Sequence, residues 1–372
     1  MLSLFRPNGN LTFPVRTLKQ KKINEARIIV KAIELVEYNK LVYKDVDVPR
    51  PGAKEVLIKV HAVGICGSDI HGIDGSTGRR IPPVIMGHEA TGTIEELGEG
   101  CSRFSKGDRV TFDSTLYCGE CYYCTRGFLN LCDNRRVLGV SCDEYRQNGA
   151  FAEYVVVPER GVYDLPDGLS FEHGAMVEPV SIAVHGFSLA KKRIDDTAVV
   201  IGAGVIGLLL IQALKFSEIG KLIAVDIDPA KLEKARELGA DITFNAKETE
   251  VPQAVWKETG GRGADVAFDV VGNTDSSRSA IYSLRKGGNV VIIGNFKPES
   301  QFPLVHVVSR QITVQGSCSS AGEYPACLDM MSRKIIDVEP LISAVAPLSE
   351  GVDWLHRLYN QEPGLYKVIL RP

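Results

Sequence analysis

The segment from Val199 to Gly207 constrains the fold of this chain more than any other part of the sequence. It is an apolar run that enters a glycine-rich turn at Gly202, Gly204 and Gly207 and then continues into a helix-forming sequence. In such a turn the glycines permit a tight bend, close approach of a pyrophosphate and close helix–strand packing, and the helix N-terminus adds amide donors. The segment predicts a dinucleotide-binding strand–turn–helix unit, with a glycine turn that holds no ligand as the alternative.

Strand-like and helix-like runs alternate after Thr197. We expect strands at 198–202, 222–226, 265–271 and 289–294, and helices at 205–216, 229–238 and 276–284. Repeated βα units predict a parallel, doubly wound sheet.

Asp226 ends the strand after the glycine turn, at the spacing of about 20 residues where an acidic side chain binds a ribose. A carboxylate there accepts hydrogen bonds from both ribose hydroxyls and repels a 2′-phosphate, which favours NAD over NADP. The expected cofactor-binding residues are Gly202, Gly204, Val205, Ile206, Gly207, Asp226 and Lys231.

The first half of the chain has a different pattern. From Lys31 to about Leu165, short β-type runs at 56–60, 91–97, 108–112 and 151–157 are separated by glycine and proline, which predicts a compact β-rich domain. Residues 1–29 carry only positive charges before Glu25 and contain two prolines, so we expect an N-terminal extension outside the core rather than a transit peptide.

Four cysteines, Cys118, Cys121, Cys124 and Cys132, follow the spacing C-x2-C-x2-C-x7-C. Four soft thiolates with no open position suit a tetrahedral structural zinc, with an iron–sulfur cluster as the second possibility. Disulfides are disfavoured because C-x2-C pairs bridge poorly and the other cysteines are scattered, as in a reducing cytoplasmic compartment. The segment 118–132 is therefore a predicted zinc lobe.

The overall charge points to a small-molecule partner. The 43 basic and 46 acidic side chains give a formal charge of −3, which provides no positive field for nucleic acid or an anionic membrane surface. No uninterrupted apolar stretch approaches the roughly 20 residues that cross a bilayer, so we expect no membrane association.

Cys66, His88, Glu89 and Glu178 form a dispersed set of potential ligands. Singly, each has an ordinary interpretation, such as a buried thiol, a hydrogen-bonded core histidine or a helix-capping carboxylate. Together they could form a mixed thiolate, imidazole and carboxylate metal site.

From about Lys31 to the C-terminus, the motifs resemble those of the zinc-dependent medium-chain dehydrogenase/reductase superfamily in order and spacing. The matching elements are Gly-Ile-Cys-Gly-Ser-Asp at 64–69, Gly-His-Glu at 87–89, Gly-Asp-Arg-Val at 107–110, the four-cysteine lobe and the glycine turn. The resemblance implies an α/β protein with a GroES-like catalytic domain at 30–184 and 321–372 and a Rossmann domain at 185–320.

The resemblance also implies roles for the dispersed ligands. Cys66 and His88 match catalytic zinc ligands, and Glu89 matches the adjacent glutamate that ligates or approaches the metal. Glu178 stands at the third position, where alcohol dehydrogenases of the family place a cysteine, so the chain looks like the sorbitol and polyol dehydrogenase branch. Glu178 could act on the metal directly or through water. Threonine dehydrogenases, with Asp-Pro where Glu178-Pro179 stands here, are the second match.

The implied reaction is reversible oxidation of a secondary alcohol of a polyol or sugar-like substrate to a ketone, with hydride transfer to NAD and two zinc ions per chain. Ser68 and His71 match the family's proton relay, and Asp69 and Asp108 are candidates for holding the site's geometry. We expect a homo-oligomer, a dimer or tetramer. The alternatives are an L-threonine 3-dehydrogenase-like enzyme and a non-catalytic NAD-binding sensor; the second is disfavoured because Cys66, Ser68 and His88 are all present.

Overall fold

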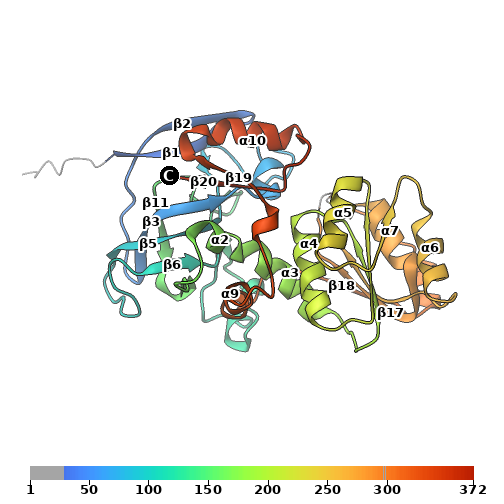
Figure 1. The fold of residues 1–372 in the computed structure, drawn as a ribbon. Coiled ribbons are helices and arrows are strands. Elements are labelled where there is room, and N and C mark those ends of the chain that lie inside the picture. Colours follow the sequence, from blue (N-terminus) through green and yellow to red (C-terminus); the bar gives the residue numbers. More distant parts are fainter. Residues whose placement is uncertain (1–28, 296, 298) are drawn as a thin grey trace, which may run out of the picture.

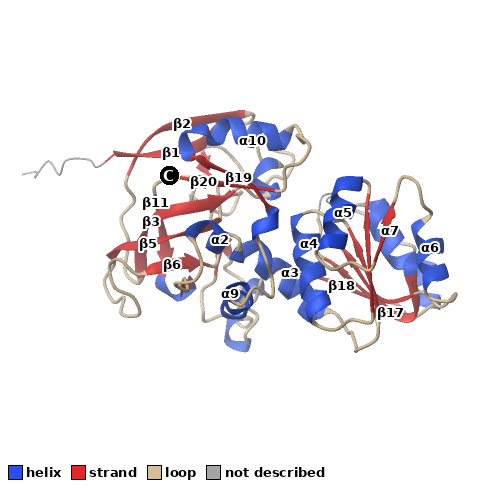
Figure 2. Cartoon of the chain, in the orientation of Figure 1, coloured by secondary structure: helices blue, strands red, loops and turns tan. Residues whose placement is uncertain are grey.

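The computed structural model describes residues 29–372 except 296 and 298, and it has two lobes (Figure 1). One lobe is rich in β-strands and combines the beginning and the end of the chain; the other alternates strands and helices (Figure 2). Of the expected extension 1–29, only Ile29 lies within the described residues, where it begins a strand. No helix in the described ranges is long and apolar enough to span a membrane.

The β-rich lobe is built around one sheet in the order β12-β6-β5-β3-β20-β19, with β11 paired to β3. A smaller sheet has the order β2-β1-β4. The principal strands are β1 (Ile29–Glu37), β2 (Lys40–Asp47), β3 (Glu55–Gly64), β4 (Val84–Ile85), β5 (Glu89–Leu97), β6 (Arg109–Phe112), β11 (Tyr154–Pro158), β12 (Val162–Asp164), β19 (Ile342–Pro347) and β20 (Lys367–Arg371). Short strands β7 (Thr115–Leu116), β8 (Arg136–Val137), β9 (Val140–Ser141) and β10 (Arg146–Gln147) lie in the loops.

The last strand, β20, completes this sheet from the far end of the chain. It pairs antiparallel with β3, where Ile369 faces Gly64 and Leu370 faces Val63. Val368, Ile369 and Leu370 are fully buried. The β-rich lobe therefore depends on the C-terminal strand for its core.

The second lobe holds a six-stranded parallel sheet in the order β15-β14-β13-β16-β17-β18. Its strands are β13 (Thr197–Ile201), β14 (Lys221–Asp226), β15 (Ile242–Asn245), β16 (Ala264–Asp269), β17 (Leu284–Ile292) and β18 (Thr313–Gly316). Its helices are α4 (Val205–Phe216), α5 (Pro229–Glu237), α6 (Val251–Glu258), α7 (Thr274–Ser283) and α8 (Leu304–Ser309). This is the expected doubly wound sheet.

The remaining helices lie in or beside the β-rich lobe. They are α1 (Gly67–Ile70), α2 (Phe171–Ala175), α3 (Val177–Leu189), α9 (Tyr324–Ser332) and α10 (Gly351–Tyr359). The long helix α3 lies between the two lobes in Figure 1, and its buried residues share one apolar core with α4 and α9.

Several boundaries differ from the expected ones for local reasons. The strand expected at 265–271 ends at Asp269, because its Oδ1 accepts the N–H groups of Val271 and Gly272, both at 3.0 Å, and turns the chain out of the sheet. The helix expected at 276–284 begins at Thr274, because the Asn273 side chain caps the N–H of Ser276. The strand expected at 151–157 begins only at Tyr154.

Candidate metal and nucleotide sites

Cys66, His88 and Glu89 come together at one edge of the large sheet. Across β3 and β5, Gly64 pairs with Glu89, so the end of β3 and the start of β5 lie side by side. One ligand atom from each of the three residues lies within 4.8 Å of the other two. A thiol, an imidazole and a carboxylate at this separation fit a divalent transition metal such as zinc.

Asp69 lies beside this cluster and contacts two of its residues. It is fully buried; its Oδ1 lies 3.4 Å from His88 Nδ1, and its Oδ2 accepts the Cys66 N–H at 3.4 Å. Burial lowers the pKa of His88, but the negative charges of Asp69 and Cys66 outweigh it and raise that pKa well above its usual value. A carboxylate that binds one ring nitrogen leaves the other nitrogen for a metal.

Asp108 does not hold the geometry of the metal site as predicted. Its carboxylate accepts the backbone N–H of Ser105 at 2.7 Å, in the turn that leads into β6. It therefore stabilises this turn, as a short acidic side chain commonly does, rather than the ligand cluster.

Lys367 holds the carboxylate of Glu89. Its Nζ lies 2.8 and 2.6 Å from the two carboxylate oxygens and also donates to Ile65 O at 3.0 Å. The two residues are 3% and 1% exposed. A carboxylate with both oxygens bound to an ammonium group is a weaker metal ligand, so the pair favours approach to the metal over ligation by Glu89.

Glu178 lies beside the cluster rather than inside it. It is the second residue of α3 and half-buried, and its carboxylate does not come within 4.8 Å of all three ligand atoms. Burial raises the pKa of Glu178 to about 7; Glu89 adds to the rise and His88 opposes it. From this position Glu178 can contact a metal through a water molecule, or directly after a small movement of its side chain.

Ser68 and His71 lie on and just after the short helix α1, and both are exposed. Ser68 Oγ accepts a hydrogen bond from Arg80 Nη2 at 3.3 Å. The predicted relay residues thus follow Cys66 directly and reach from the metal cluster towards solvent.

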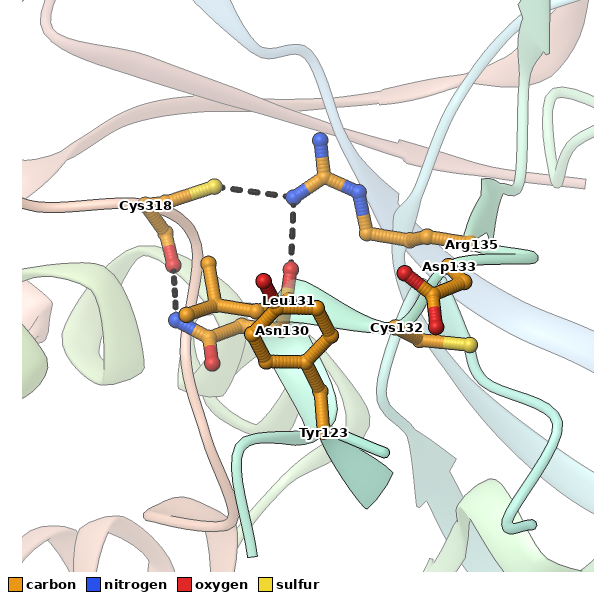
Figure 3. Close-up of a pocket in the computed structure, with 7 residues that line it drawn as sticks. All are labelled: Tyr123, Asn130, Leu131, Cys132, Asp133, Arg135 and Cys318. Carbon is orange, nitrogen blue, oxygen red and sulfur yellow. Dashed lines mark hydrogen bonds between the residues drawn. The ribbon is translucent and has the colours of Figure 1, made fainter. Parts of the chain in front are cut away.

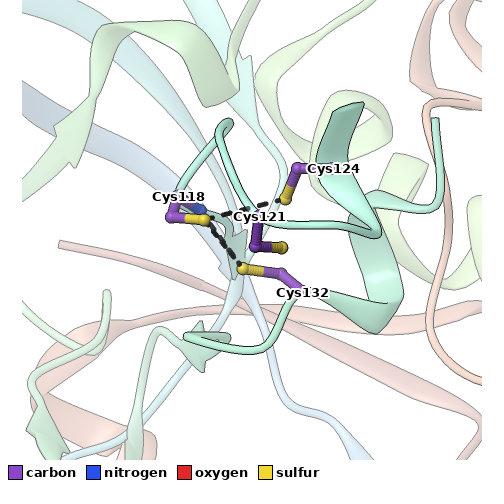
Figure 4. Close-up of side chains that lie close together, drawn as sticks. All are labelled: Cys118, Cys121, Cys124 and Cys132. Atoms are coloured by element: carbon purple, nitrogen blue, oxygen red, sulfur yellow. Dashed lines mark hydrogen bonds between the residues drawn. The ribbon is translucent and has the colours of Figure 1, made fainter. Parts of the chain in front are cut away.

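The four cysteines of the lobe surround a common point (Figure 4). The Sγ atoms of Cys118 and Cys132 are 3.5 Å apart, and those of Cys118 and Cys124 are 4.0 Å apart. Four thiolates around zinc at about 2.3 Å would be about 3.8 Å apart, which matches. Backbone N–H groups of Glu120 and Cys121 lower the pKa of Cys118 to about 6, so a thiolate forms readily.

The glycine turn has the shape that a pyrophosphate requires. Gly202 has a φ of +103°, and a Cβ on Gly207 would lie 1.9 Å from Gly202 O, so neither position accepts a side chain. A Cβ on Gly204 would meet nothing within 4 Å. Gly204 is the N-cap of α4 and contributes no capping side chain, which leaves the helix amides open to an anion.

The Asp226 carboxylate also binds backbone N–H groups, which the sequence did not indicate. Its Oδ2 accepts the N–H of Ala203 at 2.7 Å, and its Oδ1 accepts those of Ile227 and Asp228 at 2.7 and 3.0 Å. These bonds fix the carboxylate against the glycine turn. Lys231 lies in the first turns of α5 and is half-buried.

A cavity of about 430 Å³ lies between the cysteine lobe and the segment after β18 (Figure 3). Asn130 Nδ2 donates to Cys318 O at 2.7 Å, and Arg135 Nη1 lies 2.8 Å from Cys318 Sγ. These contacts join segments 183 and 188 positions apart in the chain, and no local pattern in the sequence indicates them. Arg80 and Lys367 were missed for the same reason.

Comparison with known proteins decides the family. Residues 52–167 match the model of the alcohol dehydrogenase GroES-like domain, and residues 205–333 match that of the zinc-binding dehydrogenase. The sorbitol dehydrogenase of Halalkalibacterium halodurans is 36% identical over 329 residues, which cover 87% of this chain and 93% of that protein. The chain belongs to the zinc-dependent medium-chain dehydrogenase/reductase superfamily. Like other members of this superfamily, it is an oxidoreductase that uses zinc and NAD(P).

Solved structures of this superfamily share the whole fold. Galactitol-1-phosphate dehydrogenase from Escherichia coli has a TM-score of 0.85 at 26% identity, covering 92% of this chain and 100% of that one. A protein described as a short chain alcohol dehydrogenase from Escherichia coli CFT073, complexed with NADH, has a TM-score of 0.85 at 30% identity, covering 92% of this chain and 99% of that one. The expected fold class, a GroES-like domain with a Rossmann domain, is confirmed.

Proposed function

We propose that this dehydrogenase oxidises a secondary alcohol of a polyol or sugar-like substrate to a ketone with NAD as hydride acceptor. The observation that carries the proposal is the convergence of Cys66, His88 and Glu89, with the Glu178 carboxylate beside them. Relatives named sorbitol dehydrogenase and galactitol-1-phosphate dehydrogenase support the same substrate class.

In the proposed reaction, Cys66 and His88 hold the catalytic zinc. A bound zinc supplies Lewis acidity, which lowers the pKa of a hydroxyl group at the site. Ser68 accepts the proton of the alcohol through its hydroxyl oxygen and passes its own proton outwards. His71 is exposed three residues further on, and its imidazole is the terminal acceptor of the relay.

The preference for NAD rests on Asp226. Three backbone N–H groups fix its carboxylate at the end of β14, beside the glycine turn. A fixed negative charge there accepts hydrogen bonds from a ribose and repels a 2′-phosphate. Asp226→Arg should shift the preference towards NADP, measured as the ratio of kcat/KM values for the two cofactors; an unchanged ratio would assign the choice to another residue.

An activity screen tests the substrate class. The purified protein is incubated with NAD and a panel of polyols, aldonates and L-threonine, and NADH formation is followed by absorbance. Turnover of polyols with two zinc ions per chain by elemental analysis is expected. Turnover of L-threonine alone would favour the threonine dehydrogenase alternative, and NAD binding with no turnover of any alcohol would favour a sensor.

We also infer a homo-oligomer formed through the edge strand β18. In the described part of the chain β18 pairs only with β17, and all four of its residues are exposed. The neighbouring helix α8 exposes Leu304, Val305 and Val308 by 69–81%. Burial of this apolar face against a second copy explains its composition. Val305→Glu with Val308→Glu should give monomers by light scattering, whereas an unchanged mass would exclude this face.

We also propose residues 30–184 with 321–372 as the catalytic domain and residues 185–320 as the NAD-binding domain. The thiols of the cysteine lobe support a reducing, cytoplasmic compartment, because oxidation would remove the ligands of the structural zinc.

A further inference from the structure

Arg80 is a buried cation at the metal cluster. It lies in the glycine-rich loop before β4 and is only 3% exposed, whereas its neighbour Arg79 is exposed. Arginine is almost never this buried unless it is paired. Its positive charge is therefore expected to interact with groups close to it.

The backbone around Arg80 is fixed on both sides. The backbone N–H of Ser141, in β9, donates to Arg79 O at 3.2 Å, and Ser141 O accepts from Ile81 N at 2.9 Å. Arg80 thus forms a short β-bridge with Ser141, and the side chains of Arg79 and Arg80 point to opposite sides of it. The side chain of Arg80 then passes over Gly72, where a Cβ would lie 2.3 Å from Arg80 Cγ. The loop is thus shaped to admit this one long side chain.

The guanidinium group of Arg80 binds two residues of α1 at once. Nη2 donates to Asp69 Oδ1 at 3.0 Å and to Ser68 Oγ at 3.3 Å, and Nη1 donates to Arg79 O at 3.0 Å. The same Asp69 oxygen lies 3.4 Å from His88 Nδ1. In the described part of the chain, no group forms a hydrogen bond of good geometry with His88 Nδ1. The Asp69 carboxylate at 3.4 Å is placed to orient this imidazole.

The contact to Asp69 acts on the metal ligand. The guanidinium bound to Asp69 at 3.0 Å keeps this carboxylate in place beside His88, where it can accept the Nδ1–H of the imidazole. The Nε2 lone pair of His88 then faces the metal. Contacts of this kind, one residue behind the ligand, typically change metal affinity by about 10–100-fold.

The contact to Ser68 acts on the proton relay. A guanidinium has five donors and no acceptor, so the Ser68 hydroxyl can only accept from Arg80. Its hydrogen must therefore point away from Arg80, towards the exposed side of α1. One lone pair of the oxygen remains free for the proton of the substrate. This is the orientation that a relay from substrate to solvent requires.

We propose that Arg80 is a positioning residue that holds the zinc ligand His88, through Asp69, and the relay residue Ser68, directly, in one geometry. The inference rests on the proposed function for Ser68, but its metal-binding half requires only the zinc site. Arg80 itself touches neither the substrate nor the metal.

The test compares Arg80→Lys with Arg79→Lys, which makes the same change on the exposed neighbour. Lysine keeps the positive charge of the buried site but lacks the planar fork that reaches both partners. For Arg80→Lys, zinc affinity, measured on metal-free protein by chelator competition, should fall by about tenfold. Its kcat should fall by about tenfold or more while KM changes little. Arg79→Lys should match the wild type in all three quantities.

Two further measurements separate the two contacts. Ser68→Ala should leave zinc affinity unchanged, and its effect on kcat should be less than additive with that of Arg80→Lys, since both changes act in part on one hydroxyl. Asp69→Asn should lower zinc affinity by the same factor as Arg80→Lys. Cobalt-substituted protein should show a shifted visible spectrum in Arg80→Lys and an unshifted one in Ser68→Ala.

Wild-type zinc affinity in Arg80→Lys would overturn the link to His88, and fully additive losses of kcat would overturn the link to Ser68. A loss of folding in Arg80→Lys, seen by circular dichroism of the metal-free protein, would overturn the proposal by making Arg80 a structural residue. These outcomes are distinct from failure of the proposed function, in which the wild-type protein oxidises no polyol although its zinc affinity still depends on Arg80.

Discussion

Replacement of Lys367 by methionine tests the buried ion pair beside the metal ligands. Lys367 Nζ lies 2.6 and 2.8 Å from the carboxylate oxygens of Glu89, and the two residues are 3% and 1% exposed. Lys367→Met leaves the carboxylate buried without a counter-charge. Removing one partner of such a pair costs about 3–5 kcal/mol. At about 2–4 °C per kcal/mol for a domain of this size, Tm should fall by about 6–20 °C.

The double variant Lys367→Met with Glu89→Gln separates the unpaired charge from the lost packing. It should recover most of the stability, because replacing a whole buried ion pair by neutral groups is often close to neutral. The matched control is Lys59→Met, an exposed lysine of β3, which should stay within about 0.5 kcal/mol of the wild type.

The assay is urea unfolding and thermal melting of metal-free protein, repeated after zinc is added. The loss in Lys367→Met should be smaller with zinc, because the released Glu89 carboxylate can then bind the cation. A loss below about 1 kcal/mol without zinc, or a double variant no more stable than Lys367→Met, would refute this account of the pair.

The remaining predictions concern other parts of the molecule. Cys124→Ser should reduce the zinc content by elemental analysis from about two ions per chain to about one and lower the Tm; an unchanged content would remove Cys124 from the ligands. Burial raises the pKa of Asp113 to about 7. The unfolded chain releases the Asp113 proton above about pH 4, whereas the folded state keeps it up to about pH 7. The bound proton therefore contributes to the free energy of unfolding. This contribution is complete below about pH 4 and is lost as the pH rises towards 7. Asp113→Asn, which still accepts from Thr115 N, should remove this fall in melts between about pH 5 and about pH 8; a curve parallel to the wild type would contradict it. Gly204→Ala should keep the wild-type Tm, since the added Cβ meets nothing within 4 Å, but weaken NAD binding about tenfold by calorimetry, whereas Gly316→Ala, equally uncrowded, should change neither.

Features with a local signal were predictable. Helix α4 has the expected bounds, because Gly204 before it and the unbroken apolar run within it mark a buried helix. Cys118, Cys121, Cys124 and Cys132 gather in space because the spacing between them is short. In both cases the interacting groups are close neighbours along the chain, so the pattern of residue types already contains the contact.

Elements without such a signal were missed. The strand β15 has four half-buried residues with no alternation, and it is a strand because it pairs with β14. The helix α8 has six residues and the strand β18 has four, so neither is long enough to show a clear periodicity of apolar residues. Tertiary pairing, rather than local preference, decides these segments.

The polar surroundings of the metal site were the hardest part to predict, and they determine its charge. Lysine and arginine are ordinarily exposed, and Lys367 meets its partner Glu89 only across 278 positions of the chain. Arg80 neutralises Asp69 and Lys367 neutralises Glu89. The charges that remain for a divalent cation are the Cys66 thiolate and the nearby Glu178 carboxylate, which together would balance it. Glu178 stands where alcohol dehydrogenases of the family place a cysteine. A glutamate there keeps the negative charge of the site and changes only the ligand chemistry, from sulfur to oxygen.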